Sequence, residues 1–287
     1  MASRIEVRKT YKLYVGGAFP RSESGRSYEV ADTLGRFLAN AALASRKDAR
    51  DAVVAARKAQ PGWWGATAYN RGQVLYRVAE VMEGRREQFV ADVVAAEGLT
   101  ARRAEAVVDA AIDRWVWYAG WADKLAQVLG SSNPVAGPYF DFSLPEPTGV
   151  VAVVAPQSSS LLGLVSVVAP VVVAGNTCVV LASEDRPLPA VTLSEVLATS
   201  DVPGGVVNVL TGRVAEVTPW LAAHMDVNAI DLAGVDDAAL RTELEIAAAD
   251  NVKRVRRPDT DDWSADPGLA RLRSFVETKT VWHPIGV

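Results

Sequence analysis

The feature that most constrains the fold is a series of short apolar runs separated by helical patterns between residues 149 and 249. The first run, Gly149–Pro156, carries no polar side chain. Strands of a parallel sheet are buried on both faces and are therefore apolar throughout. Strands that alternate with helices are joined by right-handed crossovers. The sequence thus predicts an α/β fold, a Rossmann-like open parallel sheet with helices on both faces.

This region is expected to hold four strands and four helices. The run Leu161–Ala174 has no charged residue but is shorter than the roughly 20 residues needed to cross a bilayer, so we expect a buried helix and no membrane contact. The expected strands are 149–156, 177–181, 205–210 and 227–232, and the expected helices are 161–174, 187–198, 214–224 and 236–249.

The N-terminal part predicts a small hairpin followed by helices. Residues 11–20 alternate and then reach a Gly-Gly pair, which is typical of a hairpin. Ser45, with Asp48 three residues later, is a candidate N-cap for a helix that Pro61-Gly62 should end. The further expected helices are 70–87, 86–97 and 102–130.

Two extended segments are predicted outside this body. Residues 131–148 are rich in proline, which favours an edge strand. The run Phe275–Trp282 is rich in β-favouring residues and predicts a strand. A terminal strand without a following partner invites pairing with another chain.

Composition narrows the function further. The formal net charge of −4 and the pI of about 5.4 argue against non-specific nucleic-acid binding. Cys178 is the single cysteine, which excludes an internal disulfide and fits a reducing compartment. Residues 1–8 lack the apolar core of a signal peptide. We therefore expect a cytoplasmic protein, and no metal site is expected.

Several motifs together resemble the aldehyde dehydrogenase superfamily. They occur in the family's order, from about residue 11 to 255 and again from 269 to the end. The chain is similar to a shortened, non-catalytic member, like the degenerate second domain of two-domain aldehyde dehydrogenases. The motifs are Tyr14–Phe19, Pro147–Pro156, Ala174–Thr177, Val202–Gly212 and Glu277–Trp282.

The resemblance implies a catalytic cysteine, an oxyanion-stabilising asparagine and a glutamate base, and this chain departs from all three. Cys178 lies in an expected strand, away from the nucleophile's place. Ser158 stands at the asparagine's place, and loss of such a donor costs about 10²–10³ in rate. Pro258 falls where the glutamate is expected. We therefore expect no catalytic residue in this chain.

The resemblance also implies NAD binding, which this sequence weakens. Glu184 matches a residue that binds the adenine ribose, although it reads equally well as a surface glutamate. Gly234 still permits a phosphate to approach a helix N-terminus. Asp236 and Asp237 would repel a pyrophosphate. NAD binding is thus possible but weakened, with Glu184 and Gly234 as vestigial contacts.

The expected organisation follows from these segments. Residues 1–133 and 149–257 are expected to form the nucleotide-binding-like domain, and 258–268 a loop that replaces the catalytic domain. Segments 134–148 and 269–287 are expected to supply oligomerisation strands. The residues expected at the subunit contact are Tyr139, Phe140, Phe142, Phe275, Val276, Val281 and Trp282.

Three functions are consistent with this organisation. The first is a structural or regulatory subunit, inactive by itself, that forms a hetero-oligomer with a complete NAD-dependent aldehyde dehydrogenase, or a homo-oligomer. The second is an active NAD(P)-dependent oxidoreductase that acts on aldehydes, for which no nucleophile is apparent. The third is an NAD-sensing regulatory subunit.

Overall fold

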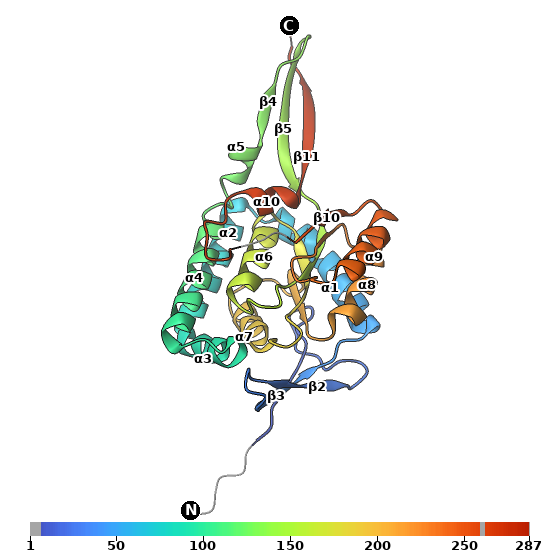
Figure 1. Cartoon of the computed structure of the whole chain (residues 1–287). Coiled ribbons are helices and arrows are strands. Elements are labelled where there is room, and N and C mark those ends of the chain that lie inside the picture. Colours follow the sequence, from blue (N-terminus) through green and yellow to red (C-terminus); the bar gives the residue numbers. More distant parts are fainter. Residues whose placement is uncertain (1–6, 259–261, 287) are drawn as a thin grey trace, which may run out of the picture.

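A five-stranded parallel sheet forms the centre of the molecule, and helices cover both of its faces (Figure 1). The computed structural model describes residues 7–258 and 262–286. The strand order is β10-β9-β6-β7-β8, and all four pairings are parallel. The strands are β6 (Val150–Val154), β7 (Thr177–Leu181), β8 (Val207–Leu210), β9 (Ala229–Asp231) and β10 (Arg254–Arg256).

The helices between these strands confirm the predicted alternation. Each expected helix and strand of this region is present, with ends that differ by no more than two residues. The fold class is therefore confirmed as α/β with an open parallel sheet. The helices are α6 (Leu162–Val173), α7 (Leu188–Leu197), α8 (Val214–Ala223) and α9 (Ala238–Ala249).

The sheet separates two hydrophobic cores, because alternate residues of each strand point to opposite faces. Val151 and Val153 of β6 lie in a first core with residues of α2, α3, α4 and α6. Val150 and Val154 lie in a second core with residues of α1 and α8. Burial on both faces explains why these strands are apolar throughout.

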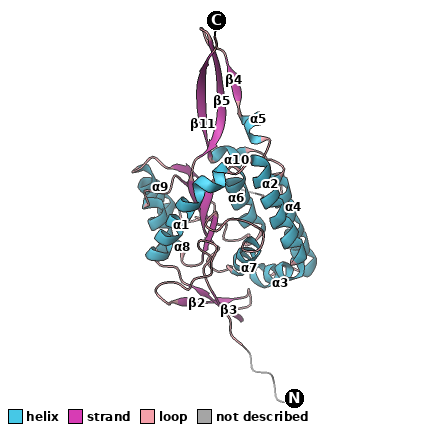
Figure 2. Ribbon diagram, turned by 180° about the vertical axis from the view of Figure 1, so that it is seen from behind, coloured by secondary structure: helices cyan, strands magenta, loops and turns pink. Residues whose placement is uncertain are grey.

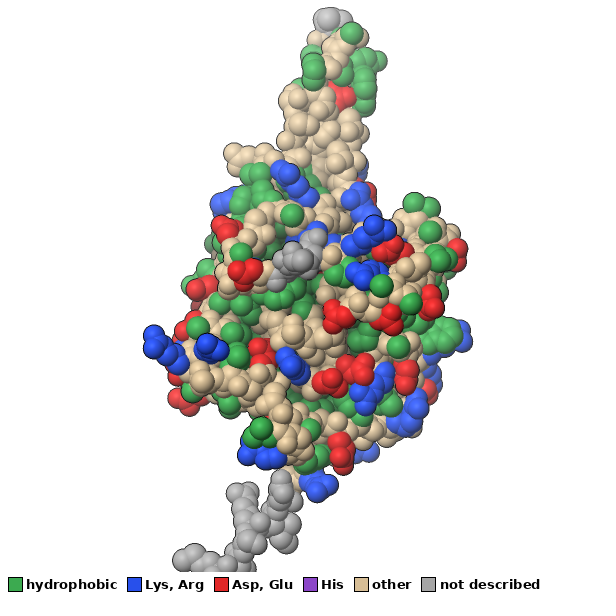
Figure 3. All heavy atoms as spheres, viewed as in Figure 1, with side chains coloured by type: hydrophobic (Ala, Val, Ile, Leu, Met, Phe, Trp, Pro, Cys, Tyr) green, Lys and Arg blue, Asp and Glu red, His purple; other side chains and the backbone are tan. Residues whose placement is uncertain are grey.

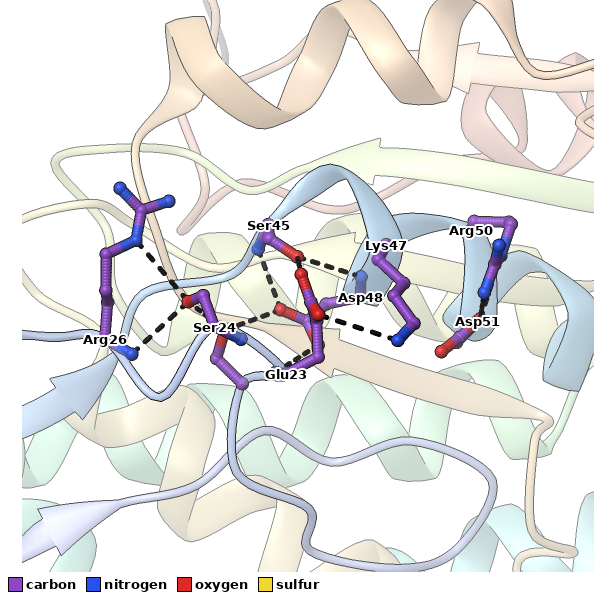
Figure 4. Close-up of polar contacts among 9 residues, drawn as sticks. Glu23, Ser24, Arg26, Ser45, Lys47, Asp48, Arg50 and Asp51 are labelled. Carbon is purple, nitrogen blue, oxygen red and sulfur yellow. Dashed lines mark hydrogen bonds and ion pairs between the residues drawn. The ribbon is translucent and has the colours of Figure 1, made fainter.

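Helix α1 (Arg46–Gly65) begins as predicted but does not end as predicted. Ser45 and Asp48 form a capping box, with Ser45 Oγ accepting from the Asp48 amide at 3.3 Å and Asp48 Oδ2 accepting from the Ser45 amide at 2.8 Å (Figure 4). The expectation that Pro61-Gly62 ends the helix is wrong, since Pro61 lies inside it. Trp63 holds the last turn in place, because its buried indole N–H donates to the Val172 carbonyl at 2.8 Å.

The rest of the N-terminal part contains one unpredicted sheet and one broken helix. Strands β1 (Thr10–Tyr11), β2 (Ser27–Ala31) and β3 (Phe37–Ala42) form a small sheet at the end of the molecule far from the C-terminal strand (Figure 1). The expected helix 102–130 is interrupted after Ala119 by a turn at Gly120. The remaining helices are α2 (Ala68–Gly84), α3 (Arg86–Glu97), α4 (Ala101–Ala119) and α5 (Leu125–Leu129).

A three-stranded antiparallel sheet, here called the flap, projects from the body (Figures 1 and 2). It contains β4 (Ser131–Asn133), β5 (Tyr139–Pro147) and β11 (Val276–Pro284), in the order β11-β5-β4. The expected boundary at residue 134 is therefore too late, because β4 already belongs to the flap. Helix α10 (Ala270–Ser274) connects the body to β11.

The pairing within the flap corrects two predictions. Strand β11 pairs along its whole length with β5 of the same chain, so it is not without a partner. Strand β5 was expected at an edge but lies between the other two. Its prolines, Pro145 and Pro147, lie beyond the stretch that β4 pairs with, so no ladder donor is lost there.

Candidate functional site

Four predicted site residues follow the carboxyl ends of parallel strands. Ser158 follows β6, Glu184 follows β7, Gly234 follows β9 and Pro258 follows β10. The chain runs from β6 outward to β7 and β8 and then returns to β9 on the other side of β6. Ligands of open α/β sheets bind outside the carboxyl ends at such a reversal. The topology therefore brings these positions to the edge where a nucleotide would be expected.

The serines after β6 bond to neighbouring segments through hydroxyl or backbone groups. Ser158 is exposed, and its carbonyl accepts a bond from Arg186 Nη1 at 2.8 Å. Ser159 Oγ accepts from the Gly163 amide at 2.9 Å, near the start of α6. The Ser160 hydroxyl donates to Glu97 at 2.7 Å. These contacts fix the path of the chain between β6 and α6.

The carboxylate of Glu184 is already engaged within the protein. It accepts from the Val214 amide at 2.8 Å and from Arg213 Nη1 at 2.8 Å. Val214 is the first residue of α8, so the carboxylate lies at a helix N-terminus, where negative charge is stabilised. The Glu184 amide donates to Gln157 Oε1 at 2.9 Å. A ribose would have to compete with these bonds, and the sequence alone did not reveal Gln157 or Arg213.

Gly234 is required by the close approach of two chain segments. A Cβ at this position would lie 1.9 Å from the Ala155 carbonyl oxygen. The Gly234 amide donates to the Val154 carbonyl at 3.0 Å, and Val235 beside it is buried. Packing against the end of β6 is thus sufficient to explain this glycine without a phosphate.

Cys178 lies inside β7 and is fully buried. Burial raises the pKa of its thiol well above the ordinary value, because the thiolate loses its hydration. The thiolate is the reactive form, so this cysteine is a poor nucleophile. In the part of the chain that the structure describes, no group of three His, Cys, Asp or Glu residues is placed to hold a metal ion. Within that same part, no helix combines the length and hydropathy of a membrane span.

The segment 257–269 joins β10 to α10 and is fastened to the body by buried arginines. Pro258 is its half-buried second residue, and residues 259–261 lie outside the described part. Arg114 of α4 donates from Nη2 to the carbonyls of Trp263 and Ala265, at 2.8 and 3.0 Å. Trp263 packs against the first core, and the guanidinium of Arg271 lies 4.9 Å from the centre of its indole.

Arg271 also forms a buried ion pair with Asp231 at the end of β9. The distance from Arg271 Nη1 to Asp231 Oδ2 is 2.6 Å, and both side chains are almost completely buried. The pair joins the central sheet to α10.

The flap has an aromatic cluster on each face. Tyr139 and Trp282 pack edge to face with ring centres 5.7 Å apart, and Trp282 is 58% exposed. Phe140 and Phe142 on the opposite face have ring centres 5.3 Å apart. Apolar side chains are visible at the outer end of the flap in Figure 3. Six of the seven residues expected at a subunit contact lie in the flap strands.

Phe275 is the seventh, and its predicted place is wrong. It ends α10, one residue before β11, and its side chain is buried in the first core. Its carbonyl accepts from Asn176 Nδ2 at 2.8 Å and from the Thr148 amide at 3.3 Å. Phe275 therefore fastens the flap to the body and exposes no surface for a partner.

The outer edge of β11 carries backbone groups that β5 does not use. Bonds from Thr148 to Phe275 and from Ile285 to Pro138 bracket the ladder and fix its parity. Odd-numbered residues of β11 therefore bond to β5, and even-numbered residues direct their backbone groups outward. The outward residues are Val276, Thr278, Thr280, Trp282 and Pro284, of which the proline supplies only a carbonyl.

Comparison with known proteins gives one family. The sequence model described as "Aldehyde dehydrogenase family" matches residues 19–256 and thus ends with the last residue of β10. Cytosolic 10-formyltetrahydrofolate dehydrogenase of Pongo abelii is 32% identical over 257 residues, which cover 87% of this chain and 28% of that protein. Aldehyde dehydrogenase family 2 member B4, mitochondrial, of Arabidopsis thaliana is 32% identical over 257 residues, which cover 88% of this chain and 46% of that protein.

A solved structure agrees with these sequence matches. PnpE from Pseudomonas sp. WBC-3 superposes with a TM-score of 0.81 at 28% identity, covering 88% of this chain and 50% of that chain. The chain thus spans half or less of the length of these three relatives.

Proposed function

The chain belongs to the aldehyde dehydrogenase family, and from this premise we propose that it is a non-catalytic subunit that docks onto a complete NAD-dependent aldehyde dehydrogenase. Its role there is structural or regulatory. The observation that carries the proposal is the flap, which exposes aromatic side chains on both faces and has an outer edge of β11 that no described strand pairs with. The location that goes with this proposal is cytoplasmic, as the single cysteine predicts.

The environment of Cys178 supports the non-catalytic part of the proposal. An aldehyde would have to reach a sulfur atom that is enclosed within β7 and has a raised pKa. The Glu184 carboxylate caps α8, and Gly234 packs on β6, so the two vestigial NAD contacts already have structural roles. These contacts weigh against the NAD-sensing alternative as well.

The edge of β11 supports the docking part of the proposal. Strand addition uses backbone hydrogen bonds for affinity and side chains for specificity. Outward groups recur at every second residue of β11, and Trp282 is an exposed anchor beside them. Tryptophan is enriched among the residues that contribute most to protein interfaces. We therefore place the contact on β11, with Tyr139 and Trp282 on one face and Phe140, Phe142 and Val281 on the other.

Two proline variants test the docking with a matched design. Thr278→Pro removes an outward N–H and leaves the hydroxyl contact between Ser143 and Thr280 in place, so the flap should stay intact while co-elution with a co-expressed complete family member is lost. Val281→Pro removes an N–H that faces β5, so it should disrupt the flap itself and abolish co-elution together with the β5–β11 ladder. Size-exclusion chromatography with light scattering measures the complex, and amide hydrogen exchange measures the ladder.

The proposal fails if the wild-type chain does not co-elute with a complete family member at micromolar concentration. It also fails if Thr278→Pro binds as well as the wild type. Aldehyde-dependent NADH production by the purified chain, abolished by Cys178→Ala, would instead favour the oxidoreductase. Calorimetric titration with NAD and NADP separates the sensing subunit, for which a saturable heat is expected.

A further inference from the structure

A small pocket lies where the body meets the root of the flap. Its volume is about 240 Å³. Its walls come from the end of α1, from α2 and α5, and from the body-side ends of β5 and β11. Trp64, Leu125, Ala126, Pro145 and Val276 line it with apolar surface, and Arg71 is the buried polar residue among its walls.

Arg71 is buried but only partly satisfied. It is 5% exposed, and its Nη1 donates to the carbonyls of Trp64 and Ala66 at 3.2 and 2.6 Å. Its Nε is buried with no hydrogen-bond acceptor in the described part of the chain. Arginine stays protonated inside proteins, so the Nε–H of the charged Arg71 guanidinium is a donor without an acceptor among the described residues.

The charge of Arg71 also has no carboxylate to balance it. Within residues 7–258 and 262–286, no acidic side chain forms an ion pair with Arg71. Burial lowers the pKa of the guanidinium, which reflects the cost of removing its hydration. The ring of Trp64, 5.1 Å from the guanidinium carbon, supplies a weaker cation–π contact. Asp123 at the pocket is paired with Lys124 at 3.0 Å.

We propose that this pocket binds a small organic monocarboxylate, with its carboxylate on the Arg71 guanidinium and its apolar part against Trp64, Leu125 and Val276. A carboxylate is a strong partner for a guanidinium, and it would supply the counter-charge that the described residues do not give Arg71 at the wall of this pocket. The apolar walls favour an anion with a hydrocarbon part over inorganic phosphate. Asp123 nearby disfavours a second negative charge.

The pocket volume limits the size of this ligand. Pockets for drug-sized ligands are about 300–1,000 Å³, and this one is smaller. An aromatic ring that bears one carboxylate fits that limit. The ligand would touch Pro145 of β5 and Val276 of β11, so its binding would also stabilise the root of the flap. This site does not depend on the docking proposed above, because it lies on the body side of the flap.

Benzoate is the probe for the test, and benzamide is its neutral counterpart of the same shape. Isothermal calorimetry on the whole chain should give one saturable site for benzoate, with a dissociation constant in about the millimolar range or tighter. Benzamide should bind at least about tenfold more weakly, since a hydrogen bond to a charged group is stronger. Inorganic phosphate should give no saturable heat.

Two kinds of variant locate the site. Arg71→Met should abolish benzoate binding, but it also removes two bonds that hold the end of α1. Ala126→Phe therefore serves as the second variant, because it fills the pocket from an exposed position of α5 and removes no bond. Gln127→Phe, on the same helix and outside the pocket, is the matched control and should bind benzoate like the wild type.

The proposal is overturned if benzoate gives no saturable heat, or if benzamide binds equally well. It is also overturned if Ala126→Phe leaves the benzoate affinity unchanged. A pocket that accepts only a carboxylate delivered by a partner protein would leave benzoate inert, and that result counts against the proposal too.

Discussion

The flap and the segment 257–269 are both connected to the central body, but they differ in how many of their polar and apolar groups contact that body. In the described part of the segment, the Trp263 carbonyl accepts a bond from Arg114, and the Trp263 side chain packs against the first core. Arg271, just after the segment, pairs with Asp231. In the flap, Trp282 is 58% exposed, and every second residue of β11 directs backbone groups to an edge that no described strand pairs with. Both regions contain a tryptophan, Trp263 in the segment and Trp282 in the flap, so apolar side chains alone do not distinguish the two regions. Unused bonding capacity distinguishes the flap.

The largest expected effect is on the side of the segment 257–269. Asp231→Ala should destabilise the chain by about 3–5 kcal/mol, because it removes one partner of a buried ion pair. Urea denaturation followed by tryptophan fluorescence measures the change. Glu245→Ala removes the carboxylate of the pair between Arg257 and Glu245, whose arginine is well exposed, and should leave the midpoint unchanged. Equal effects of the two variants would show that the segment is not fastened in this way.

A pair of tryptophan variants compares the two regions directly. Trp263→Ala should cost about 2 kcal/mol, because its half-buried indole packs on the first core. Trp282→Ala should leave the free energy of unfolding nearly unchanged and weaken the proposed complex instead. Denaturation and co-elution together separate the two results. If Trp282→Ala destabilises the isolated chain as much as Trp263→Ala, the contrast between the regions is broken.

The smallest expected effect is on the other face of the flap. Phe140→Ser should change the free energy of unfolding by less than about 0.5 kcal/mol, because Phe140 is 49% exposed. The same variant should reduce binding of a hydrophobic dye to the native chain. If Phe140→Ser instead caused a large loss of stability, the face of the flap that carries Phe140 and Phe142 would be part of a hydrophobic core. The flap would then resemble the segment 257–269, whose Trp263 packs against the first core.

The central sheet could be predicted from the sequence because its signal is local. Apolar runs such as Gly149–Pro156 reflect burial on both faces, and that burial is a property of the strand itself. The capping box at Ser45 is likewise encoded within four residues. These elements depend on no distant contact for their recognition.

The failures share a different origin, which is contact between distant residues. Pro61 stays inside α1 because Trp63 bonds to Val172, more than 100 residues away. Phe275 looks like a strand residue, but its side chain enters the first core and its carbonyl binds Asn176. Arg213, the partner of Glu184, is 29 residues away and could not be recognised from the sequence for the same reason.

The position of the prolines in β5 limits what the flap can build. Residues of β5 with odd numbers point their backbone away from β11, and there Pro145 and Pro147 offer no donor. On that side, only the three residues of β4 pair with β5. A new strand can therefore extend the flap on one side only. In the proposed complex, assembly through this sheet would therefore stop after a single addition, so the chain would cap the complex without seeding a fibre.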